Sequence, residues 1–139
     1  MNNYYKKIKM LEKRKDIQDY VDGITAMGDE DFPFIRGKVK DSEKPIVLYY
    51  KGDIRLLQAD KRNVAVIGLL NPDAYTMDEE NQVVEQLVKH GYGIVSGLAM
   101  GCDSVAHKAT LNSNGKTIAI LPSSLKTILP AQNKDLAEQ

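Results

Sequence analysis

Short apolar runs alternate with amphipathic stretches over the second half of the chain. The runs at 64–67, 92–95 and 117–121 suit strands buried on both faces, as parallel sheets require. Between them, 77–90 and 103–112 carry apolar residues at helical spacing. Strand, helix, strand, helix and strand in about 60 residues predict a βαβαβ unit with right-handed crossovers. The predicted fold is therefore α/β, with a Rossmann-like parallel sheet.

The first third of the chain follows a different pattern. A broken apolar stripe over 4–27 predicts one charged helix or two short ones, followed by a loop-rich connection. The apolar run at 46–50 predicts a further strand, which we expect to join the parallel sheet. The sequence thus predicts an N-terminal helical and loop extension over 1–45 and a partial Rossmann-like domain over 46–139.

The composition is that of a globular protein, with 42% hydrophobic and 27% charged residues. No apolar run approaches the roughly 18 residues of a transmembrane helix, and the charged N-terminus lacks a signal-peptide core. The single cysteine, Cys102, excludes an internal disulfide and a cysteine zinc cluster. The two histidines, His90 and His107, fit no metal-ligand pattern. We expect a cytoplasmic protein without membrane contact, metal or cofactor.

Charge is balanced overall but not along the chain. Residues 1–62 hold 14 Lys/Arg and 11 Asp/Glu, whereas residues 63–139 hold 5 and 8. Phosphate binding would therefore have to come from a local site and not from the overall field.

The connection GIVSGLAMGCDSVAHKA, residues 93–109, holds more small residues than an ordinary strand-to-helix turn needs. In open α/β sheets, ligands lie outside the carboxyl ends of the strands. Ser96 can direct its hydroxyl at a ligand, Gly97 and Gly101 can adopt positive φ, and Asp103 is placed to cap the helix. The free N–H groups of that helix would then make an anion site. The alternative is that the small residues only allow close helix-to-sheet packing.

The candidate phosphate-binding residues lie in this turn, in the helix that follows it and in the turn after 64–67: Gly68, Ser96, Gly97, Leu98, Ala99, Gly101, Asp103, His107 and Lys108. No G-x-G-x-x-G follows the first strand of the βαβαβ unit, and no G-x-x-x-x-G-K-[ST] is present.

No catalytic set is apparent. Cys102 has no base beside it in the sequence, and we interpret it as a buried filler. We interpret His90 as closing a helix C-terminus, and the acidic run 78–80 as the first turn of a helix.

The stretch IVSGLAMGCDSVAHKATLNSNGKTIAIL resembles the signature of the DNA-processing protein A family (DprA, also called Smf), S-G-x-A-x-G-[IV]-D-x-x-A-H, then a helix and G-x-T-I-A-V-L. PIVLYYKGDIRLL and NVAVIG are similar to two upstream segments of the family, and Pro130 and Asn133 match its Y-P-x-x-N motif. The similarity covers about 31–138. It implies a Rossmann-like domain that binds single-stranded DNA through a phosphate pocket built by these turns. The resemblance also implies that, in transformable bacteria, the protein helps to load the recombinase RecA onto single-stranded DNA.

The chain departs from the family pattern at several positions. Gly68-Leu69-Leu70 stands where the family has G-S-R, whose Arg contacts phosphate, and Pro122-Ser123-Ser124 replaces a G-x-G pair. Leu129 stands in place of the motif tyrosine. The family continues past residue 139 with a half that, by resemblance, supplies dimer and RecA contacts. The sequence leaves open whether the chain is a fragment or a short divergent member.

Three functions stay open. The first is a non-catalytic module that binds single-stranded DNA in DNA processing, uptake or recombination. The second is a binder or sensor of a nucleotide or nucleotide derivative, and the third is a partner-binding fragment that mimics part of DprA. Catalysis is not expected, because the G-G-x-G-T-x-x-E segment of enzymes in the wider fold group is absent. We expect weak, salt-sensitive ligand binding, and a homo-oligomer or a partner at the open sheet edge.

Overall fold

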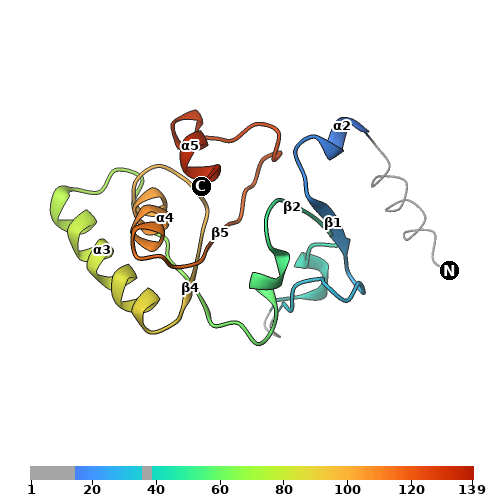
Figure 1. Ribbon diagram of the computed structural model, residues 1–139, viewed down its shortest axis with the longest axis horizontal. Helices are drawn as coiled ribbons and strands as arrows, with labels where there is room; N and C mark the ends of the chain where they lie inside the picture. Colours follow the sequence, from blue (N-terminus) through green and yellow to red (C-terminus); the bar gives the residue numbers. More distant parts are fainter. Residues whose placement is uncertain (1–14, 36–38) are drawn as a thin grey trace. The chain divides into compact units, whose positions relative to one another are not determined.

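The computed structural model describes residues 15–35 and 39–139, and these divide into two compact units between Ala59 and Asp60 (Figure 1). The sequence placed the division after residue 45. It falls later because the strand near residue 50 pairs inside the first unit and not with the parallel sheet.

The first unit is built on a two-stranded antiparallel sheet. Its elements are α2 (Lys15–Gln18), β1 (Gly23–Ala26), η1 (Asp41–Glu43), β2 (Val47–Tyr50) and η2 (Ile54–Leu57).

The pairing of β1 with β2 corrects two expectations. Gly23 lies opposite Tyr50 and Ala26 opposite Val47 in the antiparallel register, so β2 is not part of the parallel sheet. The predicted helix over 4–27 is wrong over β1, where the β-branched Thr25 is buried on the strand. Residues 1–14 of that prediction lie outside the described residues.

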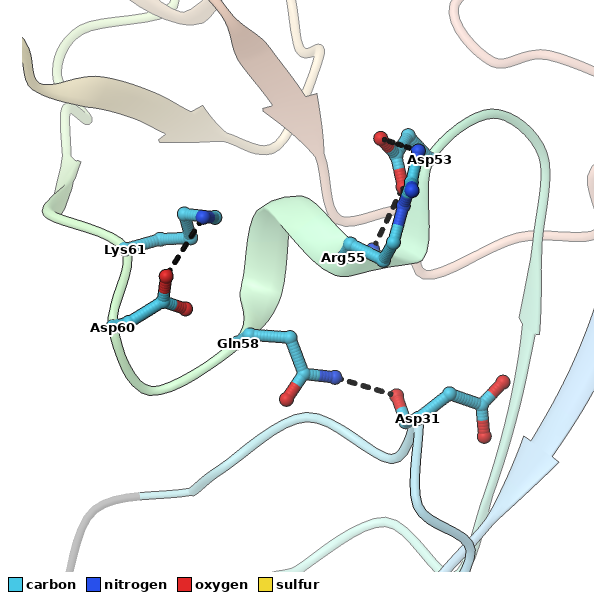
Figure 2. A network of polar contacts seen from close by, with 6 residues as sticks. All are labelled: Asp31, Asp53, Arg55, Gln58, Asp60 and Lys61. Atoms are coloured by element: carbon cyan, nitrogen blue, oxygen red, sulfur yellow. Dashed lines mark hydrogen bonds and ion pairs between the residues drawn. The ribbon is translucent and has the colours of Figure 1, made fainter.

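The 3-10 turn η2 is fixed by polar contacts at both ends (Figure 2). Asp53 caps it by accepting the Arg55 backbone N–H at 3.0 Å and pairs with the Arg55 guanidinium at 2.7 Å. Gln58 Nε2 donates to the Asp31 carbonyl at 3.2 Å. The exposed ion pair contributes little by itself, so the cap and the Gln58 bond define the turn.

The second unit contains the predicted parallel sheet. Strands β3 (Asn63–Ala65), β4 (Gly93–Ser96) and β5 (Thr117–Ala119) pair in parallel in the order β3-β4-β5, with α3 (Ala74–Lys89) and α4 (Cys102–Asn112) as the crossovers. The predicted βαβαβ unit is confirmed.

Helix α3 begins earlier than the sequence predicts. Asp73 is its N-cap, with a carboxylate oxygen 2.8 Å from a first-turn backbone N–H. The acidic run 78–80 therefore lies in the second turn and not in the first, which corrects that interpretation. The interpretation of His90 is confirmed: it is the C-cap, and its Nδ1 lies 2.7 Å from the Gln86 carbonyl.

Both long helices lie side by side (Figure 1). They share one face of the sheet because both crossovers advance in the same direction with the same hand. The core under them consists of Val84, Ile94, Ala106 and Ala109, packed by Val66, Leu87 and Val88. Burying a side chain such as Ile94 contributes about 1.5–3 kcal/mol.

Neither α3 nor α4 covers the opposite face of this sheet. Ile67, just beyond β3, is 80% exposed, and Ala65 and Ile120 are exposed too. The expectation that these strands are buried on both faces is therefore wrong, because only one helical layer covers them.

The chain ends in η3 (Ala131–Asn133) and α5 (Lys134–Ala137). Asn133 and Leu136 are buried, and α5 contacts α4. This segment is therefore anchored on the second unit. Among the described residues, no helix is both long enough and apolar enough to cross a membrane.

Candidate nucleic-acid interface

The turn between β4 and α4 is held against the loop that follows β3. Gly101 is the N-cap of α4, with φ +76° and ψ −130°. A Cβ on Gly101 would lie 2.2 Å from the Leu69 carbonyl oxygen and 2.4 Å from that of Leu70. The Cys102 N–H donates to the same Leu69 carbonyl at 2.9 Å. Only glycine fits here, and the predicted positive φ of Gly101 is confirmed.

The second predicted positive φ falls on a different residue. Leu98, and not Gly97, has a left-handed backbone, with φ +61°. Gly97 is needed for another reason, because its Cβ would lie 2.8 Å from an Asp103 carboxylate oxygen. The expectation for Gly97 is therefore corrected from a backbone role to a close-approach role.

Asp103 does not cap the helix. It lies in the first turn of α4, and its Oδ2 accepts the backbone N–H groups of Gly97 at 3.1 Å and Ala99 at 3.2 Å. The carboxylate turns back to the preceding loop because Gly101 already occupies the cap position. The N–H groups of Gly97 and Ala99, two of the candidate phosphate-binding residues, are thus already hydrogen-bonded within the protein.

Two serine side chains near the turn, Ser96 of the candidate set and Ser104, also point inward. Ser96 is buried, and its hydroxyl donates to the Val66 carbonyl at 2.7 Å. The expectation that this hydroxyl points at a ligand is therefore wrong, because it ties β4 to β3 at the ends of the strands. Ser104, in the first turn of α4, donates to the Ala99 carbonyl at 2.6 Å.

His107 is 2% exposed and lies between α4 and β5. Its Nδ1 is 2.6 Å from Thr117 Oγ1, and that hydroxyl donates to the Ile94 carbonyl at 3.1 Å. Nδ1 therefore donates the proton, and Nε2 carries a lone pair that is buried without a hydrogen-bond partner among the described residues.

The surroundings of His107 keep it neutral. Burial lowers the pKa of its imidazole, and the nearby Asp103 carboxylate offsets this in part. His107 thus contributes no surface cation, whereas the next residue, Lys108, is exposed.

Several backbone donors remain at the carboxyl end of β4. Within the described part of the chain, the N–H groups of Met100, Gly101, Asp103 and Ser104 have no protein acceptor. They surround the N-terminus of α4, where the helix dipole favours negative charge. An oxygen of a phosphate or a carboxylate is the chemical partner that accepts hydrogen bonds from such donors.

The other turn at this edge of the sheet is less polar than the family pattern. A Cβ on Gly68 would lie 2.7 Å from Cys102 Sγ, so Gly68 allows close packing of the β3 turn on α4. Leu69 and Leu70 follow it with exposed fractions of 61% and 62%. Leu70, at the position where the family pattern has arginine, is thus an exposed leucine.

Cys102 is a buried free thiol. The Glu80 side chain on α3 raises the pKa of this thiol, and burial raises it further. The interpretation of Cys102 as a buried filler is confirmed, and the position of Glu80 beside it was missed because the sequence placed this residue on a helix surface.

Asn133, which the family resemblance names only as part of the Y-P-x-x-N motif, also belongs to this region. Its side chain is 4% exposed and lies against the turn between β4 and α4. The available signal was a polar residue three positions after Pro130 in the C-terminal segment, but no spacing rule connects it to a turn 35 residues earlier.

The structure thus describes a small Rossmann-like module with a glycine turn at the carboxyl edge of a parallel sheet. Residues 23–139 match the family model described as DNA recombination-mediator protein A. The chain therefore belongs to this family, and the resemblance seen in the sequence is confirmed.

Individual relatives carry the names DprA and Smf. The chain is 35% identical over 107 residues to the DNA processing protein DprA of Bacillus subtilis and 39% identical over 113 residues to the Protein Smf of Synechocystis. These alignments cover 77% and 80% of this chain. The X-ray structure of DprA from Streptococcus pneumoniae matches 89% of this chain with a TM-score of 0.75 and 31% identity.

The relatives are much longer than the matched region. The chain spans 35% of the Bacillus subtilis protein, 28% of the Synechocystis protein and 41% of the Streptococcus pneumoniae chain.

Proposed function

We propose that this chain is a non-catalytic module that binds single-stranded DNA phosphates at the turns after β3 and β4, within DNA processing, uptake or recombination. The observation that carries the proposal is the group of backbone N–H donors at the N-terminus of α4, which have no acceptor among the described residues. Membership of the DNA recombination-mediator family supports nucleic acid as the source of the phosphate.

The proposed contacts are mainly with the main chain. The N–H groups of Met100, Gly101, Asp103 and Ser104 would donate to the oxygens of one phosphate. The exposed Lys108 would add a cation one turn along the helix. The backbone around this position is shaped by Gly68, Gly97, Leu98 and Ala99. The buried side chains of Ser96 and His107 stabilise it through their hydrogen bonds to Val66 and Thr117.

The same site is built for weak binding. Leu69 and Leu70 offer no charge, and the Asp103 carboxylate lies beside the proposed phosphate position. Nucleic-acid affinity comes largely from phosphates neutralised by Lys and Arg, so few cations mean low affinity.

The proposed lack of catalysis rests on two side chains. The pKa of the buried Cys102 thiol is raised, and the buried His107 is held neutral with its Nδ1 proton committed to Thr117. Neither is arranged as an activated nucleophile or as an accessible general base.

A free nucleotide or nucleotide derivative is the second candidate ligand. One cluster of N–H donors fits one phosphate, and the exposed Leu69 and Leu70 suit an apolar base face better than a second phosphate. A homo-oligomer, a partner at the sheet edge and contact with RecA stay predictions.

A titration tests the proposal. We expect a fluorescein-labelled oligothymidylate to bind weakly to the full chain, with affinity falling as salt rises from low to moderate concentration. Lys108→Ala should reduce the slope of log affinity against log salt by about 0.7, the share of one phosphate of a single strand. Lys89→Ala, an exposed lysine at the C-terminus of α3, is the matched control and should leave the slope unchanged.

The outcomes separate the candidates. Displacement of the oligonucleotide by mononucleotide at similar concentration would favour the nucleotide reading. Tight binding that ignores salt, or a Lys108→Ala slope equal to that of the parent, would contradict the proposed phosphate contacts.

A further inference from the structure

We infer that Asn133 is a positioning residue for the proposed phosphate site, setting the conformation of the turn between β4 and α4 without touching the ligand. The expected effect on ligand affinity rests on the proposed function. The hydrogen bonds of Asn133 that support its role in the turn do not depend on that function. Asn133 ends η3, and its amide is buried against that turn.

The Asn133 Nδ2 lies within hydrogen-bond distance of three acceptors, which share its two protons. Its Nδ2 lies 2.9 Å from the Leu98 carbonyl oxygen, 3.1 Å from that of Ala99 and 2.8 Å from Ser104 Oγ. Carbonyl oxygens only accept, so the amide must present its NH₂ group to them. The Ser104 hydroxyl already donates to the Ala99 carbonyl, which leaves its oxygen free to accept from Asn133.

These bonds hold the residue with the unusual backbone. Leu98 is buried and has φ +61°, a conformation that residues with a Cβ adopt only when the surroundings stabilise it. The carbonyl of Leu98 is one of the three acceptors. Asn133 thus supports the left-handed residue through a bond that a hydrophobic side chain at position 133 would not supply.

Both the N–H groups and the carbonyl groups of the turn are held by side chains. Asp103 holds the N–H groups of Gly97 and Ala99, while Asn133 holds the carbonyls of Leu98 and Ala99. The Ala99 carbonyl and the Met100 N–H belong to the same planar peptide group, so fixing this carbonyl also fixes the direction of the Met100 N–H at the start of the donor cluster. The C-terminal segment therefore determines where the proposed phosphate donors point.

Removal of the amide tests this role directly. In Asn133→Ala, amide hydrogen exchange at Gly97 and Ala99, whose N–H groups are hydrogen-bonded to Asp103, should accelerate about tenfold or more, since the buried hydrogen bonds that hold the turn are lost. Exchange within α3 should stay at the parent rate, and oligothymidylate affinity should fall about tenfold. Gln132→Ala, an exposed neighbour in η3, is the matched control and should behave like the parent.

A second variant covers the case in which Asn133→Ala does not fold. Asn133→Asp has the same shape but places a carboxylate against two carbonyl oxygens, so its protonated form is favoured and its pKa should rise above the ordinary value of about 3.9. Because the protonated acid donates one hydrogen bond, turn protection should recover, relative to the parent at the same pH, as the pH is lowered through that raised pKa. A purely space-filling residue would show no such recovery.

The results separate the two claims. Parent-like exchange at Gly97 and Ala99 in folded Asn133→Ala, or no recovery in Asn133→Asp, would overturn the role of Asn133. If the parent chain binds no oligothymidylate, the proposed function fails, and the exchange comparison still decides whether Asn133 sets the turn.

Discussion

Gly101→Ala should lower the free energy of unfolding by about 4 kcal/mol, a cost typical of severe steric overlap at a special backbone position. The added Cβ would meet the backbone carbonyls of Leu69 and Leu70 at 2.2 and 2.4 Å, and a backbone atom cannot swing aside as the end of a side chain can. The positive φ of Gly101 adds strain to this overlap.

The matched control is Gly91→Ala at the end of α3. Gly91 also has a positive φ, of +78°, but its Cβ would meet nothing within 4 Å. We expect Gly91→Ala to cost about 1 kcal/mol, the backbone strain alone. Urea denaturation of the two variants measures the difference, and equal costs would show that the β3 and β4 turns are not in close contact.

This result bears on whether the glycines of the turn serve an anion site or only close packing of the helix on the sheet. Gly68, Gly97 and Gly101 each lie so close to protein atoms that packing alone accounts for their lack of a side chain. A binding defect in a Gly101 variant would therefore say little about a ligand, because the turn itself would be displaced. Variants of side chains around the turn, such as Lys108 and Asn133, are the better probes.

The second large effect is a loss of stability below neutral pH that depends on His107. The pKa of this buried imidazole is lowered in the folded protein, whereas in the unfolded chain it is about 6.5. Between these values, the unfolded state binds a proton that the folded state does not bind. The free energy of unfolding should therefore fall by about 1.4 kcal/mol for each pH unit as the pH drops below about 6.5.

Two measurements check the role of His107. Urea denaturation between pH 7.5 and about 5 gives the slope, and His107→Gln should remove the part of the slope that belongs to this residue. The imidazole signals followed by NMR give the titration directly. A midpoint at or above 6.5 for His107 would contradict its buried, neutral state.

Local pattern was sufficient to predict the parallel sheet. The apolar runs that became β3, β4 and β5 are separated by helical periodicity, and this alternation leaves few other topologies. It was not sufficient for β1 and β2, because an apolar run such as Val47–Tyr50 does not say which strand it pairs with. The partner, Gly23–Ala26, lies in a charged stretch whose spacing also suits a helix.

The sequence located the candidate site but did not determine the directions or the hydrogen-bond partners of its side chains. Spacing placed Asp103 at the start of α4, yet it could not tell whether the carboxylate turns forward to the helix or back to Gly97 and Ala99. Burial of His107 and the bond from Ser96 to Val66 are tertiary facts. The reach of Asn133 across 35 residues lies beyond any local rule.

The most direct test of the proposed site follows the backbone N–H groups themselves. In a ¹⁵N-labelled sample of the full chain titrated with oligothymidylate, we expect the largest amide shifts at Met100, Gly101, Asp103 and Ser104. Lys89, at the far end of α3, should keep its amide shift through the same titration. Saturable shifts elsewhere on the protein, with these four amides unmoved, would contradict phosphate binding at the N-terminus of α4.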